Sequence, residues 1–120
     1  MSIRNGIYDL LSALEGDVYP VVAPQQITDT YIVYMIRREP VRTQDGVSAY
    51  EVYLTLHIYA DELDDLETMG ATMEAGLENA SGTYDSETLA ACSWLSTEDG
   101  GYLPDLDKHE LTQEYQLLFT

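Results

Sequence analysis

The sequence has few basic residues, one cysteine and no long apolar run. Five Lys and Arg residues stand against 22 Asp and Glu residues, for a formal net charge of −17, so no basic face is available to hold nucleic-acid phosphates. The lone Cys92 cannot form an internal disulfide. No apolar stretch approaches the roughly 20 residues that cross a bilayer, and the N-terminus lacks the basic start and apolar core of a secretion signal. We therefore expect a soluble product made in the cytoplasm that neither reads nucleic acid nor enters a membrane.

The remaining composition is that of a folded chain with unevenly placed charge. Hydrophobic residues make up 45% and aromatic residues 10% of 120 residues, which is enough for one core, and we expect a single domain over residues 1–120. Residues 1–42 carry four arginines against five acids, whereas residues 43–120 carry Lys108 against 17 acids. Repulsion is thus concentrated in the second part, where solvated faces tolerate it because salt screens charges beyond about 8–10 Å.

Apolar periodicity predicts two helices. Apolar residues recur at spacings of three and four over residues 3–14, and Gly16 is a suitable stop. A second helix is predicted to follow Asp61 as its N-cap and to run to about Glu78. Its buried stripe is expected to contain Leu63, Leu66, Gly70, Met73 and Leu77. A glycine on that stripe indicates a helix backbone that lies close to the sheet.

A hairpin is predicted in the middle of the chain. Residues 31–37 are rich in β-branched and aromatic types, and Pro40 is expected to end that strand. Residues 50–59 alternate between apolar and polar, as a half-buried strand does. Asp45 and Gly46 lie between the two runs and favour a turn.

Two further strands are predicted in the second half, at residues 89–95 and 111–119. The Gly100-Gly101 pair favours a loop between them. Prolines in residues 18–24 favour an extended connector after the first helix.

The order of elements is then αββαββ. Short turns favour antiparallel pairing, and both helices can cover one face of the sheet. We expect an α+β fold, a two-layer sandwich with a mostly antiparallel four-stranded sheet and two helices on one face.

The residues that carry chemistry are few and scattered. His57, His109 and Cys92 have no spacing that pairs a nucleophile with a base, and they are interpreted as two surface histidines and one buried, inert cysteine. Asp105, Asp107 and His109 alternate, but the sequence identifies no further ligand that would converge with them on a metal. No calcium loop or phosphate-binding glycine loop is present. We predict no catalytic residue, no cofactor and no metal, hence no enzyme.

The tyrosines and arginines of the sequence favour contact with other proteins. Ten tyrosines are present, and tyrosine offers apolar area and a hydrogen bond at low entropic cost. Arg37, Arg38 and Arg42 are scarce cations in the nearly neutral part of the chain. Their expected partners are acids of an adjoining copy, and the predicted subunit interface comprises Arg37, Arg38, Arg42, Asp61, Glu62, Asp64 and Asp65. Such pairing between different patches of identical copies can close a ring.

The first 80 residues resemble the tail completion, or tail terminator, proteins of long-tailed bacteriophages. The resemblance rests on Gly6-Ile7-Tyr8-Asp9-Leu10-Leu11, Val18-Tyr19-Pro20, Ala23-Pro24, Tyr31-Ile32-Val33-Tyr34 and the run from Tyr50 to Asp61. Relatives often have proline before the tyrosine that opens the first strand, where this chain has Thr30.

The resemblance implies a virion protein at the head-tail junction, assembled in the host cytoplasm. It implies a homo-oligomeric ring, expected to be a hexamer, that contacts the tail tube protein and the head-completion or connector protein. DNA passes through such a ring without specific binding, and an acidic channel would repel its phosphates. The charge equally suits an alternative, an acidic mimic of nucleic acid that inhibits a host DNA-binding enzyme.

Overall fold

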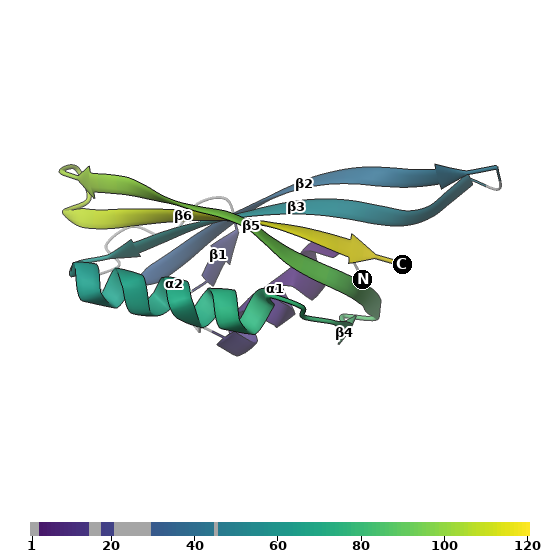
Figure 1. Cartoon of the computed structure of the whole chain (residues 1–120), viewed down its shortest axis with the longest axis horizontal. Coiled ribbons are helices and arrows are strands. Elements are labelled where there is room, and N and C mark those ends of the chain that lie inside the picture. The colour runs from purple at the N-terminus through teal and green to yellow at the C-terminus, as the bar shows by residue number, and fades with distance from the viewer. Residues whose placement is uncertain (1–2, 15–17, 21–29, 45) are drawn as a thin grey trace.

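The computed structural model describes residues 3–14, 18–20, 30–44 and 46–120. Within these residues, two helices and six strands follow one another as α1 (Ile3–Leu14), β1 (Val18–Pro20), β2 (Tyr31–Thr43), β3 (Gly46–Ala60), α2 (Leu63–Leu77), β4 (Gly82–Tyr84), β5 (Glu87–Leu103) and β6 (Lys108–Phe119). The strands form one sheet in the order β1-β2-β3-β6-β5-β4. The sheet is strongly twisted, and both helices lie on the same side of it (Figure 1).

The predicted four-stranded sheet with the order αββαββ is wrong, because the sheet has six strands and is mixed. At one edge β1 runs parallel to β2 and pairs with it from Val18↔Ile32 to Pro20↔Tyr34. This segment was expected to be a connector because of its prolines. An edge strand tolerates proline, since its outward N–H needs no partner in the sheet.

The other edge strand, β4, pairs antiparallel with the start of β5. The turn between them has positive φ at both of its residues, 49° at Asp85 and 67° at Ser86. Two such residues make the mirror-image turn that matches the twist of a hairpin. Asp-Ser lacks the glycine by which such turns are usually recognised, and the strand was therefore missed.

The helix at residues 3–14 and the β2–β3 hairpin are confirmed. However, β2 continues through Pro40 to Thr43. Because β1 covers only Ile32 to Tyr34, β2 is itself the edge of the sheet at Pro40, where proline is tolerated. Gly46 follows the turn with φ +111°, while Asp45 lies outside the described residues.

The loop predicted at Gly100-Gly101 is instead part of β5. Register shifts between Asp99 and Gly101 mark a β-bulge there, and Gly101 has φ +83°, a conformation that glycine adopts without strain. A Cβ at Gly100 would overlap the carboxyl group of Glu110. The glycines thus bend a strand rather than end it. The next strand, β6, begins at Lys108, three residues before the predicted start at residue 111.

The second helix begins one residue later than predicted, with Glu62 at the N-cap and no side-chain capping bond. The Asp61 carboxylate accepts a hydrogen bond from Lys108 Nζ at 2.6 Å instead. Gly70 does mark a close approach, since a Cβ there would lie 2.6 Å from Leu111 Cδ2. Leu63 is 57% exposed, so its expected place on the buried stripe is wrong.

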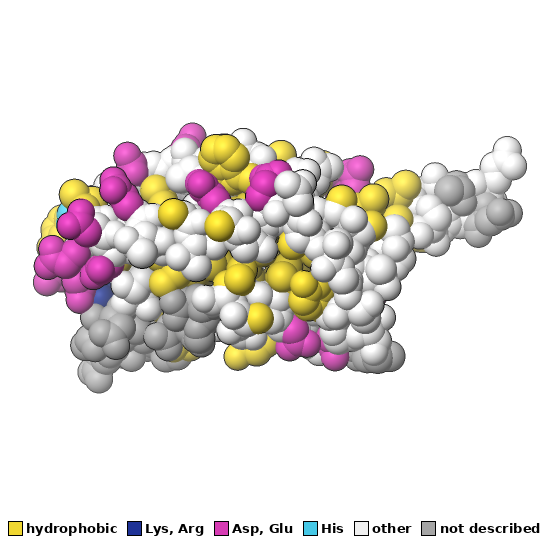
Figure 2. All heavy atoms as spheres, turned by 60° about the horizontal axis from the view of Figure 1, so that its bottom comes forward, with side chains coloured by type: hydrophobic (Ala, Val, Ile, Leu, Met, Phe, Trp, Pro, Cys, Tyr) yellow, Lys and Arg dark blue, Asp and Glu magenta, His cyan; other side chains and the backbone are white. Residues whose placement is uncertain are grey.

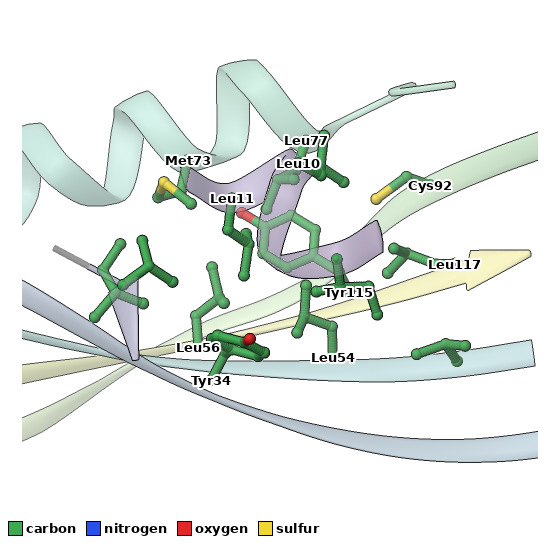
Figure 3. Packing of buried hydrophobic residues seen from close by; sticks show 14 of the residues in the cluster. Leu10, Leu11, Tyr34, Leu54, Leu56, Met73, Leu77, Cys92, Tyr115 and Leu117 are labelled. Atoms are coloured by element: carbon green, nitrogen blue, oxygen red, sulfur yellow. The ribbon is translucent and has the colours of Figure 1, made fainter. Parts of the chain in front are cut away.

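The core lies between the two helices and one face of the sheet (Figure 3). The apolar alternation of β3 places Val52, Leu54, Leu56 and Ile58 fully inside, as its pattern predicts. From the helices, Leu10 and Leu11 of α1 meet Met73 and Leu77 of α2 above the sheet (Figure 3). The strand β6 adds Tyr115, Leu117 and Phe119.

One polar network crosses this core and joins α2 to the sheet. Gln113 of β6 is fully buried, and its Nε2 donates to Gly70 O at 3.0 Å. The buried Tyr115 hydroxyl donates to Gln113 Oε1 at 2.8 Å. Gln113 thus gives the buried Tyr115 hydroxyl its acceptor and adds a second hydrogen bond to the Gly70 carbonyl of α2.

We predict that Gln113→Leu lowers the free energy of unfolding by about 1–3 kcal/mol, because it leaves the Tyr115 hydroxyl and the Gly70 carbonyl without this partner at nearly constant volume. The matched control is Gln116→Leu on the opposite face of the same strand, expected within about 0.5 kcal/mol of wild type. Urea unfolding measures both, and equal losses in the two variants would contradict the role assigned to Gln113.

Candidate assembly surface

The β2–β3 hairpin extends past the helices as an arm (Figure 1). We call residues 37–51 the arginine arm, because it holds Arg37, Arg38 and Arg42, all exposed. Side chains alternate along a strand, so Arg37 and Arg38 lie on opposite faces of the arm. The arm therefore presents a cation on each face.

Tyrosines of β3 support these two arginines. The Arg37 guanidinium lies 4.2 Å from the centre of the Tyr53 ring, and that of Arg38 lies 5.0 Å from the Tyr50 ring. Arg37 also forms an ion pair with Glu39 on its own strand. Cation–π contacts at exposed sites contribute about 0.5–1 kcal/mol each. They hold the arginines extended along the arm while leaving them accessible.

The opposite end of the molecule is acidic (Figure 2). The start of α2 brings Asp61, Glu62, Asp64 and Asp65, all exposed. Ala60 of β3 pairs with His109 of β6, so the turn between β5 and β6 lies beside the start of α2 and adds its own carboxylates. We call residues 61–65 the acidic tip.

Lys108 is the one cation of the acidic part of the sequence, and it is almost fully buried. Its Nζ bonds the Asp61 carboxylate at 2.6 Å and lies 5.8 Å from the centre of the Tyr31 ring. The lysine thereby fixes the root of the acidic tip. Lys108 compensates the charge of Asp61, whereas the carboxylates of Glu62, Asp64 and Asp65 remain exposed.

A polar cluster surrounds this lysine on the sheet face away from the helices. The rings of Tyr31 and Tyr59 are stacked with centres 5.0 Å apart. Burial raises the pKa of Tyr59, and its hydrogen bond to Glu110 raises that pKa further. His57 Nδ1 lies 3.6 Å from Glu110 Oε2 and 3.4 Å from Thr112 Oγ1. These contacts stiffen the sheet beside the acidic tip.

The arginine arm and the acidic tip cannot meet within one copy. Arg37 is paired across the hairpin with Tyr53, and Ala60 lies seven residues further along β3, roughly 23 Å at about 3.3 Å per residue. This distance exceeds the screening length of about 8 Å at physiological ionic strength. The predicted interface residues thus form two separate groups at opposite ends of a molecule 51 Å long.

The candidate chemical residues do not converge. Cys92 lies in the core on the helix-covered face of the sheet, whereas His57 lies on the opposite face. Both histidines are half-buried. His109 packs against Tyr102 with ring centres 5.2 Å apart, and the Tyr102 hydroxyl donates to Asp107.

No three His, Cys, Asp or Glu side chains in the described part of the chain are grouped so that they could hold a metal ion. Neither of the described helices is long and apolar enough to span a membrane.

The sequence pattern did not predict where two residues lie, Leu63 and Arg4. Leu63 was assigned to the core, although four acids flank it directly, and this flanking pattern is the signal that could have placed it outside. Arg4 was not grouped with the arginines of the arm, because only the fold brings α1 beside β2.

No protein-family model and no curated protein matches the chain. Its fold is shared with a chain of a solved structure described as "Virion of native gene transfer agent (GTA) particle". That alignment has a TM-score of 0.78 at 15% sequence identity and covers 98% of this chain and 94% of that chain. A second solved structure aligns with a TM-score of 0.65 at 13% identity, over 96% of this chain and 92% of that chain.

We predict that Cys92 does not react with a thiol reagent such as DTNB at pH 8 in the native protein. Burial, with a smaller effect of Glu78, raises the pKa of its thiol to about 12, so the reactive thiolate is scarce and inaccessible. Denaturation should expose one equivalent. The control is Ser93→Cys at the exposed neighbouring position, expected to react at once in the native state, and rapid native labelling of Cys92 itself would contradict its burial.

Proposed function

We propose that the chain is a structural subunit of a phage-like virion. The observation that carries the proposal is the fold shared over nearly the full length of both chains with a component of the gene transfer agent particle. The virion role also agrees with the resemblance of the first 80 residues to tail completion proteins.

Within the virion, the proposed role is to end the tail tube as a ring, expected to be a hexamer, and to join it to the head connector. Support comes from the two charged ends. An interface between two different patches of identical copies is heterologous, and it generates a closed ring when the rotation between neighbours closes. The arginine arm of one copy and the acidic tip of the next are such a pair.

In this proposal the chain catalyses no reaction, and its acidic excess acts on the DNA that passes through the ring. A channel with negative walls repels phosphates, so the genome does not adhere by counterion release as it would to a basic wall. In this proposal, the acids of residues 43–120 that make no contact between copies supply that negative charge.

We predict that Arg37→Gln combined with Arg38→Gln weakens self-association several-fold and lowers the melting temperature by no more than about 8 °C, the effect of losing two cation–π contacts of about 0.5–1 kcal/mol each. Both arginines are exposed, so their loss affects contacts between copies more than folding. Sedimentation velocity over a concentration series measures the first effect and thermal unfolding the second.

The control for this pair is Ala71→Glu combined with Ala75→Glu on the exposed face of α2, which reaches the same net charge. If the control weakens assembly equally, general repulsion rather than the arginine arm is responsible. The alternative function, an acidic mimic of nucleic acid, predicts instead a monomer or dimer that binds a basic host protein tightly.

A further inference from the structure

A hollow of about 450 Å³ lies where the first turn of α1 meets the base of the arginine arm, lined by Ile3, Arg4, Ile36 and Arg38. Its floor is apolar, because Ile3 is buried and Ile36 packs partly against the core. Its rim carries two exposed guanidinium groups, and Arg38 is held there by Tyr50. The hollow is thus an apolar depression with a cationic rim, in a protein whose net charge is −17.

The acidic tip has the complementary shape and charge. Leu63 is the most exposed of the large hydrophobic side chains in the described residues, at 57%. It stands between Glu62 and Asp64, and the Lys108 bond to Asp61 fixes the chain just before it. The tip is therefore an apolar knob with an anionic rim.

We propose that Leu63 of one copy inserts into the hollow of the next copy, with its flanking carboxylates against Arg4 and Arg38. This contact rests on the proposed ring and names its anchor. The volume suffices, because a cavity of about 150 Å³ already accepts a ligand of the size of benzene, and the remaining space takes the carboxylates.

The chemistry of the two rims selects this occupant over others. Burial of the Leu63 side chain supplies affinity. The opposite charges set the orientation of the two copies, and repulsion keeps the acidic tip from binding to an acidic surface. Within one copy, knob and hollow are kept apart by the length of β3. The contact is then made between molecules, and between identical copies it runs head to tail.

The first test compares two exposed leucines of the acidic end. Leu63→Ser should raise the dissociation constant for self-association about tenfold or more, because the anchor is lost. Leu106→Ser, at a position that is 49% exposed in the turn between β5 and β6, should leave it unchanged. Sedimentation velocity measures association, and circular dichroism with thermal unfolding verifies that both variants fold.

The second test exchanges the charges of the two rims. One variant carries Arg4→Glu and Arg38→Glu, and the other carries Glu62→Lys and Asp64→Lys. Each alone pairs like charges and should stay dissociated. In an equimolar mixture every knob meets a hollow of opposite charge, so assembly should return with the two variants alternating.

The outcomes separate this contact from the function on which it rests. A wild-type chain that stays monomeric at all concentrations contradicts both the ring and the contact. A wild-type chain that assembles, together with an unaffected Leu63→Ser variant and a mixture that fails to recover, overturns the contact and leaves the ring. Capture of the tip by a different protein, with no effect of Arg4 or Arg38 on self-association, also overturns it.

Discussion

Opposite charges at the two ends of β3 cannot neutralise each other, because about 20 Å of strand separates them and salt screens them over less than half that distance. The molecule is left with an arm that holds three arginines, offset in number by Glu39, Asp45 and Glu51, and with an anionic tip on the same sheet. Each end is stabilised locally: tyrosines support the arginines of the arm, and buried Lys108 anchors Asp61 at the tip. The charges that these local contacts do not compensate are available to bind another molecule.

The twisted sheet determines which surfaces remain open. Both helices pack on one side and over the body of the sheet (Figure 1), so the arm beyond its base has no helix over either face. A two-stranded hairpin of this kind is only marginally stable alone in water. Its continuity with β3, which runs unbroken from the arm through the core, keeps it extended, and this continuity also fixes the spacing between arm and tip.

The sequence predicted those elements whose pattern is local and strong. The 3.6-residue period of α1 and the strict alternation of β3 each bury a large apolar face, so the order of apolar residues along the chain identifies both elements. The predicted fold class was wrong because pairing between strands decides the structure at prolines and glycines that locally favour a break. Pro20 and Pro40 are compatible with strands only because their positions are at the sheet edge, and Gly100-Gly101 forms a bulge only because β6 lies alongside to pair with it.

The candidate surface was predictable in its residue types and not in its arrangement. The scarcity of cations singled out Arg37, Arg38 and Arg42, and the density of carboxylates singled out residues 61–65. Their positions at opposite ends follow from the length of β3. The exposure of Leu63 and the proximity of Arg4 to Arg38 depend on how α2 begins and where α1 packs, which no spacing in the sequence encodes.

Head-to-tail association of identical copies is tested most directly by native mass spectrometry of the purified chain over a range of concentrations and salt. We expect one closed stoichiometry, six copies by the resemblance to tail completion proteins, and dissociation to monomers as the ionic strength rises. A chain that remains monomeric, or that forms a dimer insensitive to salt, would contradict it.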